Sequence, residues 1–110
     1  MIHQEFIEAV EDSPVIAAVK DMEGLRRCFD SESKVVFILF GDVCNIADIV
    51  EKVKNHGRIA MVHMDLITGL SSKEIVVDFI KKYTKADGII STKQTLIKRA
   101  KELGLYTVFR

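Results

Sequence analysis

The 110-residue sequence lacks the features of a membrane protein, a secreted protein and a metalloprotein. Its longest uninterrupted apolar run, 35–40, has six residues, whereas a membrane-spanning helix needs about 20. No signal peptide precedes the first charged segment. The two cysteines, Cys28 and Cys44, do not have the spacing of metal ligands, which indicates free thiols, buried or half-buried, in a reducing compartment. We therefore expect a cytoplasmic protein without a metal or cofactor, formed by a single domain over residues 1–110.

Net charge is also lacking, because 16 basic and 16 acidic residues cancel. The signs are separated along the chain, however: residues 1–33 carry eight acidic and three basic side chains, and residues 73–110 carry nine basic and four acidic ones. Such separation can mark a surface for an anionic partner. A sequence pI of about 6.8 lacks the basic character that is typical of nucleic-acid-binding domains. Solvated helix faces are the simpler explanation of the charge pattern.

The sequence does contain a regular alternation of apolar segments with two different periods. Strands are predicted at 15–19, 35–40, the first half of 59–70, 89–91 and 105–109. Helices are predicted at 3–12, 21–29, 45–55, 71–83 and from residue 91 or 92 to 103. Alternation of this kind predicts an α/β fold with a parallel sheet and helical crossovers. Periodicity alone does not distinguish an open doubly wound sheet from part of a β/α barrel.

Several local signals refine these boundaries. Ser71 and Glu74 have the spacing of a capping box, which predicts a helix start with Ile75 and Phe79 among the residues turned inward. Asp87 and Gly88 are predicted to form the turn that leads into the fourth strand. Glycines at 57 and 104 are expected to end the helices that precede them.

Side chains able to bind a ligand or transfer a proton are concentrated in the segment 59–70. His63 and Asp65 are two residues apart where its strand would end, so they are expected to share one face at the carboxyl end of the sheet. Parallel α/β folds bind their ligands at that end. A histidine and a carboxylate could bind a polar ligand, exchange protons with a substrate or hold a metal, although two ligands are too few to argue for a metal. Alternatively, the histidine hydrogen-bonds within a barrel interior and the aspartate satisfies loop amides.

Basic and hydroxyl side chains follow the other strands. Ser91 and Lys93 come after the fourth strand, Lys20 after the first and Arg110 after the fifth. If the strand ends converge, these residues and His63 would form a rim able to bind a small phosphorylated or carboxylated compound. P-loops, dinucleotide fingerprints and nucleophile motifs are absent.

Longer strings in the chain resemble one bacterial family. They are PVIAAVKD from residue 14, HMDLITGLSSKE from residue 63, DFIKKY from residue 78, DGIISTK from residue 87 and IKRAKELGL from residue 97. On these strings the whole chain resembles the glycerol uptake operon antiterminator regulatory proteins.

The resemblance implies a TIM-barrel-like fold and a cytoplasmic, non-enzymatic regulator that binds glycerol 3-phosphate and acts on leader mRNA of glycerol-uptake genes. It also implies that about five of eight barrel strands are present, with an N-terminal helix and four crossover helices. An open edge at the fifth strand would favour association with a second copy.

An enzymatic alternative remains open from the residues. In a sugar-phosphate isomerase or lyase, Asp65 would act as general base and Lys20 or Lys93 as acid or Schiff-base former. A folded remnant without activity is the third possibility.

Overall fold

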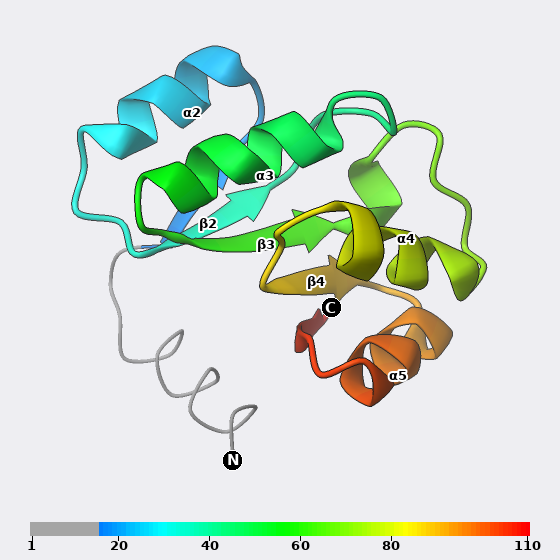
Figure 1. Ribbon diagram of the computed structural model, residues 1–110. Coiled ribbons are helices and arrows are strands. Elements are labelled where there is room, and N and C mark those ends of the chain that lie inside the picture. The colour runs from blue at the N-terminus through cyan, green and yellow to red at the C-terminus, as the bar shows by residue number, and fades with distance from the viewer. Residues whose placement is uncertain (1–15) are drawn as a thin grey trace.

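Five parallel strands lie side by side in chain order in the computed structural model, which describes residues 16–110 (Figure 1). The strands are β1 (Ile16–Val19), β2 (Val35–Ile38), β3 (Ile59–His63), β4 (Gly88–Ser91) and β5 (Tyr106–Phe109). They alternate with α2 (Met22–Phe29), α3 (Ile46–Asn55), α4 (Ile75–Tyr83) and α5 (Gln94–Glu102), and a 3-10 helix η1 (Met64–Leu66) follows β3. The helix predicted at 3–12 lies outside the described residues.

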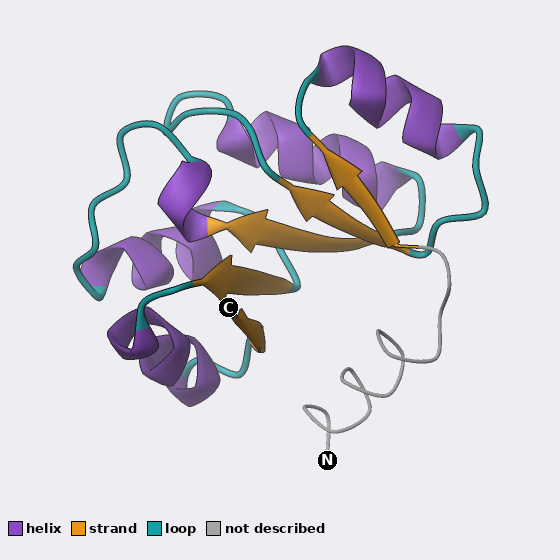
Figure 2. Ribbon diagram, turned by 180° about the vertical axis from the view of Figure 1, so that it is seen from behind, coloured by secondary structure: helices purple, strands orange, loops and turns teal. Residues whose placement is uncertain are grey.

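All four helices pack on one face of this sheet. The main hydrophobic core joins buried residues of every helix to the strand residues that point toward them, such as Val36, Val62 and Ile89. A second cluster, on what we call the inner face, contains strand residues only: Val35, Met61 and Ile90, with Ile16, Phe37, Ile59, Tyr106 and Val108 packed against them. A doubly wound sheet would carry helices on both faces. Consecutive strand order with one-sided helices is the arrangement of an incomplete β/α barrel (Figure 2).

The structure confirms the predicted start of α2 and the predicted ends of α3 and α5. Asp21 caps α2 by accepting a hydrogen bond from the Gly24 amide at 2.7 Å. Gly57 and Gly104 have φ of 72° and 77° and directly follow the C-cap residues of α3 and α5. The left-handed conformation at these positions costs glycine little.

The predicted start of α4 is wrong. The helix begins at Ile75 rather than near Ser71, the side chain of Glu74 makes no capping hydrogen bond, and the Ser71 hydroxyl accepts from the Lys73 amide instead. With this start, Val76, Val77 and Ile80 face the core while Ile75 is 66% exposed. The capping-box spacing was satisfied by a turn that comes before the helix.

The prediction that the hydroxyl of Ser91 or Thr92 caps α5 is also wrong. Lys93, not Ser91 or Thr92, is the N-cap of α5, and it makes no side-chain capping bond. Ser91 is the last residue of β4, where its hydroxyl accepts a hydrogen bond from the Lys93 amide at 2.9 Å. The loop between β4 and α5 is therefore held by side chains that the sequence pattern had placed on the helix.

The amino ends of the strands are held by one arginine and one aspartate. Arg58 donates hydrogen bonds to the carbonyls of Cys28, Phe29 and Ser31 and to the Ser33 hydroxyl, which ties the end of α2 to the start of β3. Asp87 Oδ2 accepts from Lys54 Nζ and from the Ala60 amide, both at 2.8 Å. Structural contacts of this kind at the amino ends leave the carboxyl ends available for ligands.

The two cysteines differ in their surroundings. Cys28 is buried, and burial raises the pKa of its thiol although Arg58 and Ser33 oppose this, so the thiol is protonated and unreactive. Cys44 is exposed, which differs from the expected burial because it lies in the loop before α3 rather than on a core-facing position. Among the helices between residues 16 and 110, none has both the length and the apolar character of a membrane span.

Candidate functional site

The carboxyl end of β3 places a histidine on the inner face of the sheet. His63 follows Met61 by two residues and pairs with Ile90 of β4, and both of these residues belong to the inner-face cluster. Asp65 does not continue this alternation, because the chain turns into η1 directly after His63. The prediction that His63 and Asp65 share one strand face is therefore wrong in its geometry, although the two side chains still interact electrostatically.

His63 is a buried polar side chain with an unsatisfied atom. It is 4% exposed, and its Nδ1 has no hydrogen-bond partner within residues 16–110. Burial lowers the pKa of His63 and the charge of Arg110 lowers it further, while Asp65 acts in the opposite direction. The imidazole is consequently neutral at pH 7. A buried nitrogen without a partner is unusual in a folded protein and is one mark of a site that binds something.

Asp65 connects η1 to the loop after β4. Its Oδ1 accepts from the Ser91 hydroxyl at 3.0 Å, and its Oδ2 accepts from the amide and the hydroxyl of Thr92 at 2.8 and 2.6 Å. Burial alone would raise the pKa of Asp65, but the hydrogen bonds from Thr92 and Ser91 outweigh it and lower the pKa. The carboxylate is ionised and already occupied, so Asp65 is a positioning residue for the Ser91–Thr92 loop.

We expect Asp65→Ala to destabilise the chain by about 1–3 kcal/mol, because three donors lose a charged acceptor. Asp65→Asn should recover part of this loss, since an amide oxygen can still accept from Thr92. Urea denaturation followed by circular dichroism measures the free energy of unfolding of both variants. Equal stability of Asp65→Ala and the wild type would show that the loop does not depend on this carboxylate.

Arg110 reaches the same end of the sheet from β5. Its amide donates to the Ser91 carbonyl at 3.0 Å, which extends the pairing of β4 with β5, and its charge acts on His63. The structure therefore brings together four of the six predicted residues: His63, Asp65, Ser91 and Arg110. We call this group the strand-end cluster.

The other two predicted residues contribute less. Lys93 is exposed, and its side chain has no hydrogen bond or ion pair within the described part of the chain, although its amide is bonded to Ser91. Lys20 is exposed after β1, the strand at the opposite edge from β5, and the structure shows no contact between it and the cluster. The residue that was missed is Thr92, whose position directly after a strand-end serine was the available signal.

The loop 68–72, with its glycine and serines, has a structural role at the neighbouring strand end. The Thr68 amide donates to the Gly41 carbonyl and the Thr68 carbonyl accepts from the Val43 amide, so this loop is joined to the one that follows β2. Within residues 16–110, no three histidine, cysteine or acidic side chains are grouped closely enough to hold a metal ion.

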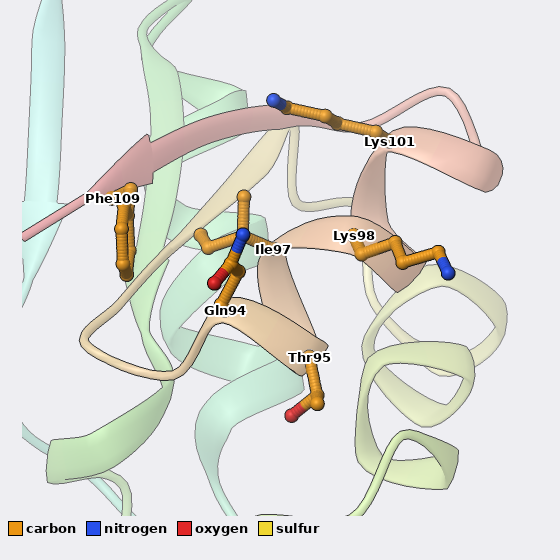
Figure 3. A pocket seen from close by; sticks show the side chains of 6 residues that line it. All are labelled: Gln94, Thr95, Ile97, Lys98, Lys101 and Phe109. Atoms are coloured by element: carbon orange, nitrogen blue, oxygen red, sulfur yellow. The ribbon is translucent and has the colours of Figure 1, made fainter.

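A separate hollow of about 440 Å³ lies on the helix side of the sheet at its β5 edge (Figure 3). Ile97 and Phe109 form its apolar part, and Gln94, Thr95, Lys98 and Lys101 complete its lining. Phe109 is 58% exposed although it is the last residue of a strand. An exposed aromatic beside an edge strand is a surface able to associate.

Comparisons with known proteins agree with this architecture. The sequence model of the family described as glycerol-3-phosphate responsive antiterminator matches residues 15–110. The Escherichia coli protein named "Uncharacterized protein YgcP" is 44% identical over 104 residues, which cover 94% of this chain and 54% of that protein.

Two solved structures are similar as well. A glycerol uptake operon antiterminator-related protein from Thermotoga maritima is 35% identical with a TM-score of 0.78, covering 87% of this chain and 54% of its own. The glycerol uptake operon antiterminator regulatory protein from Listeria monocytogenes has a TM-score of 0.85 at 23% identity, over 90% of this chain and 54% of its own. The chain thus spans about half the length of the relatives it matches.

Proposed function

The chain belongs to the glycerol-3-phosphate responsive antiterminator family, and from this premise we propose that it is a cytoplasmic regulator whose strand-end cluster binds glycerol 3-phosphate. The regulated target is leader mRNA of glycerol-uptake genes. Responsiveness to glycerol 3-phosphate and antitermination are the two properties that the family's name states. Its role is regulatory rather than enzymatic.

The observation that carries the proposal is the unsatisfied His63 Nδ1 near the charge of Arg110. A phosphate group supplies oxygen atoms that accept hydrogen bonds, and a guanidinium binds two of them at once. An anion between these two side chains would satisfy the orphan nitrogen and neutralise the arginine. Lys93 would steady the polar end of the ligand, Ser91 would hold the Lys93 amide in place, and Lys20 is a further candidate for contact.

Asp65 supports a binding role over the enzymatic alternative. A general base that works near neutral pH needs a raised pKa and access to the substrate. The pKa of Asp65 is lowered instead, and both of its oxygens accept hydrogen bonds from the loop after β4. A carboxylate in this state positions other groups better than it removes a proton.

Isothermal titration calorimetry with glycerol 3-phosphate tests the proposal. We expect saturable heat with glycerol 3-phosphate, none with glycerol, and a loss of affinity of about 10- to 150-fold in Arg110→Ala, the range of one charged hydrogen bond. Arg26→Ala is the matched control, because Arg26 is an exposed arginine on α2, outside the cluster. Absence of heat with the wild type, or equal loss in both variants, would refute the site.

We also propose that two copies of the chain associate through the edge at β5. β5 is the last strand in the order of the described sheet, and Phe109 and Ile97 offer exposed apolar surface beside it (Figure 3). Phe109→Ser should shift the sedimentation coefficient from dimer to monomer at micromolar concentration. A wild-type chain that sediments as a monomer would contradict this.

A further inference from the structure

The solvent-facing side of α4 exposes large apolar and aromatic side chains, where a helix surface usually carries polar residues. Ile75 and Tyr83 are 66% and 61% exposed. Phe79, which lies midway between them in the sequence, is half-buried. Spacing of four residues places all three on one side of the helix. Val76, Val77 and Ile80 provide the buried side, and Phe79 packs partly against the core, so Ile75 and Tyr83 are the residues of this stripe that the core leaves exposed. We call Ile75, Phe79, Lys82 and Tyr83 the α4 aromatic patch.

The patch has the geometry of a stacking surface with a cation beside it. The rings of Phe79 and Tyr83 have centroids 5.6 Å apart and are tilted by 37°. Lys82 Nζ lies over one face of the Tyr83 ring, 5.4 Å from its centroid, as a cation–π partner of that ring. A shallow hollow is lined by all four patch residues and by Asp78. In single-stranded nucleic-acid sites, a base stacks on an aromatic ring and a neighbouring cation contacts the phosphate.

The charges around the patch favour an anionic occupant. Lys81, Lys82 and Lys85 are exposed at the end of α4 and just beyond it. Asp78 is the acidic residue that borders the hollow, and it is paired with Arg99 of α5, whose Nε and Nη2 lie 2.8 and 3.2 Å from its two oxygens. Its charge is therefore compensated from the neighbouring helix, whereas Lys81, Lys82 and Lys85 form no ion pair within the described residues.

The same charges disfavour a second copy of this chain as the occupant. In a twofold interface the patch would face itself. Lysines 81, 82 and 85 of one copy would then approach those of the other, and like charges repel across an interface.

We propose that the α4 aromatic patch is the RNA-contacting surface of this protein, with Tyr83 stacking on an unpaired base and the three lysines contacting phosphates. This inference rests on the proposed function, which supplies leader mRNA as the partner. It adds the surface and the kind of RNA, because stacking on an exposed ring requires a single-stranded segment. The patch lies on a helix, whereas the strand-end cluster lies at the carboxyl end of the sheet, so RNA and metabolite would occupy different sites.

Fluorescence anisotropy with a labelled leader transcript of glycerol-uptake genes from the same genome is the test. We expect Tyr83→Ala to weaken binding about 5- to 150-fold, the range for one base–aromatic stack. Tyr83→Phe should bind like the wild type, since it keeps the ring. Lys82→Ala should lower the slope of log affinity against log salt by about 0.7, the value for one phosphate contact on a single strand.

Lys52→Ala is the matched control, an exposed lysine in the last turn of α3, and it should leave the slope unchanged. Circular dichroism melts establish that each variant is folded. Unchanged affinity in Tyr83→Ala, while the wild type binds, would overturn the surface assignment and leave the proposed function intact. Unchanged affinity together with a lower mass in sedimentation would assign the patch to contact between copies. No binding by the wild type at low salt would refute the RNA part of the proposed function and this surface with it.

Discussion

Gly88→Ala should prevent the chain from folding or cost it about 3 kcal/mol or more, because β4 has no room for a methyl group at this position. A Cβ on Gly88 would overlap the Tyr106 carbonyl oxygen and would lie 2.7 Å from Tyr106 Cβ and 2.8 Å from Met61 Cε. Gly88 pairs with Met61 on one side and with Tyr106 on the other, so these contacts come from both neighbouring strands. The methionine end can move, but the carbonyl belongs to the backbone of β5 and cannot move without breaking the sheet.

Gly104→Ala is the control for this substitution. Gly104 has φ of 77°, and a Cβ added there would meet nothing within 4 Å. It should cost only the strain of a left-handed alanine, about 1 kcal/mol. Chemical denaturation followed by circular dichroism compares the two variants. If Gly88→Ala is as stable as Gly104→Ala, the separation of β4 from β5 is wider than described here.

The affinity for glycerol 3-phosphate should fall as pH rises, by up to about tenfold per pH unit. In the free protein, burial and the charge of Arg110 lower the pKa of His63, so the imidazole is neutral at pH 7. A phosphate dianion next to it favours the charged form, so the pKa in the complex is higher than in the free protein. Binding then takes up a proton between these two pKa values, and raising the pH opposes that uptake.

Titration calorimetry between about pH 7 and 8.5 measures this effect without interference from the ligand, whose second pKa is about 6. His63→Gln is the matched variant, because it keeps a polar side chain that does not titrate, and its affinity should be constant over this range. A constant affinity in the wild type would show that the bound anion does not raise the pKa of His63 into this pH range.

The lowered pKa of His63 also makes the stability of the free protein depend on pH. Because the folded-state pKa of His63 is lowered, the unfolded chain binds more protons as the pH falls below about 6.5. The contribution of neutral His63 is therefore present above that pH and is lost as the pH falls toward the folded-state pKa. His63→Gln should lose less stability than the wild type over this interval.

Apolar spacing was sufficient to predict the order of elements between residues 16 and 110. The apolar run 35–40 predicted a strand, and the spacing of Leu96, Ile97 and Ala100 predicted a helix. The structure confirms both elements, with β2 confined to Val35–Ile38. Glycines after α3 and α5 marked the ends of both helices because only a left-handed residue continues the chain there. Such features are local, so a local pattern identifies them.

Contacts between distant residues were decided by the tertiary structure. The spacing of His63 and Asp65 predicted one shared face, but the chain turns into η1 after β3, and Asp65 binds the loop 26 and 27 residues further along. Gly88 looked like a turn residue, whereas its lack of a side chain serves close packing between β3 and β5. The choice between a doubly wound sheet and a barrel also depended on which face the helices cover. Strand period and helix period are the same for both, whereas the consecutive strand order and the packing of all four helices on one side distinguish them.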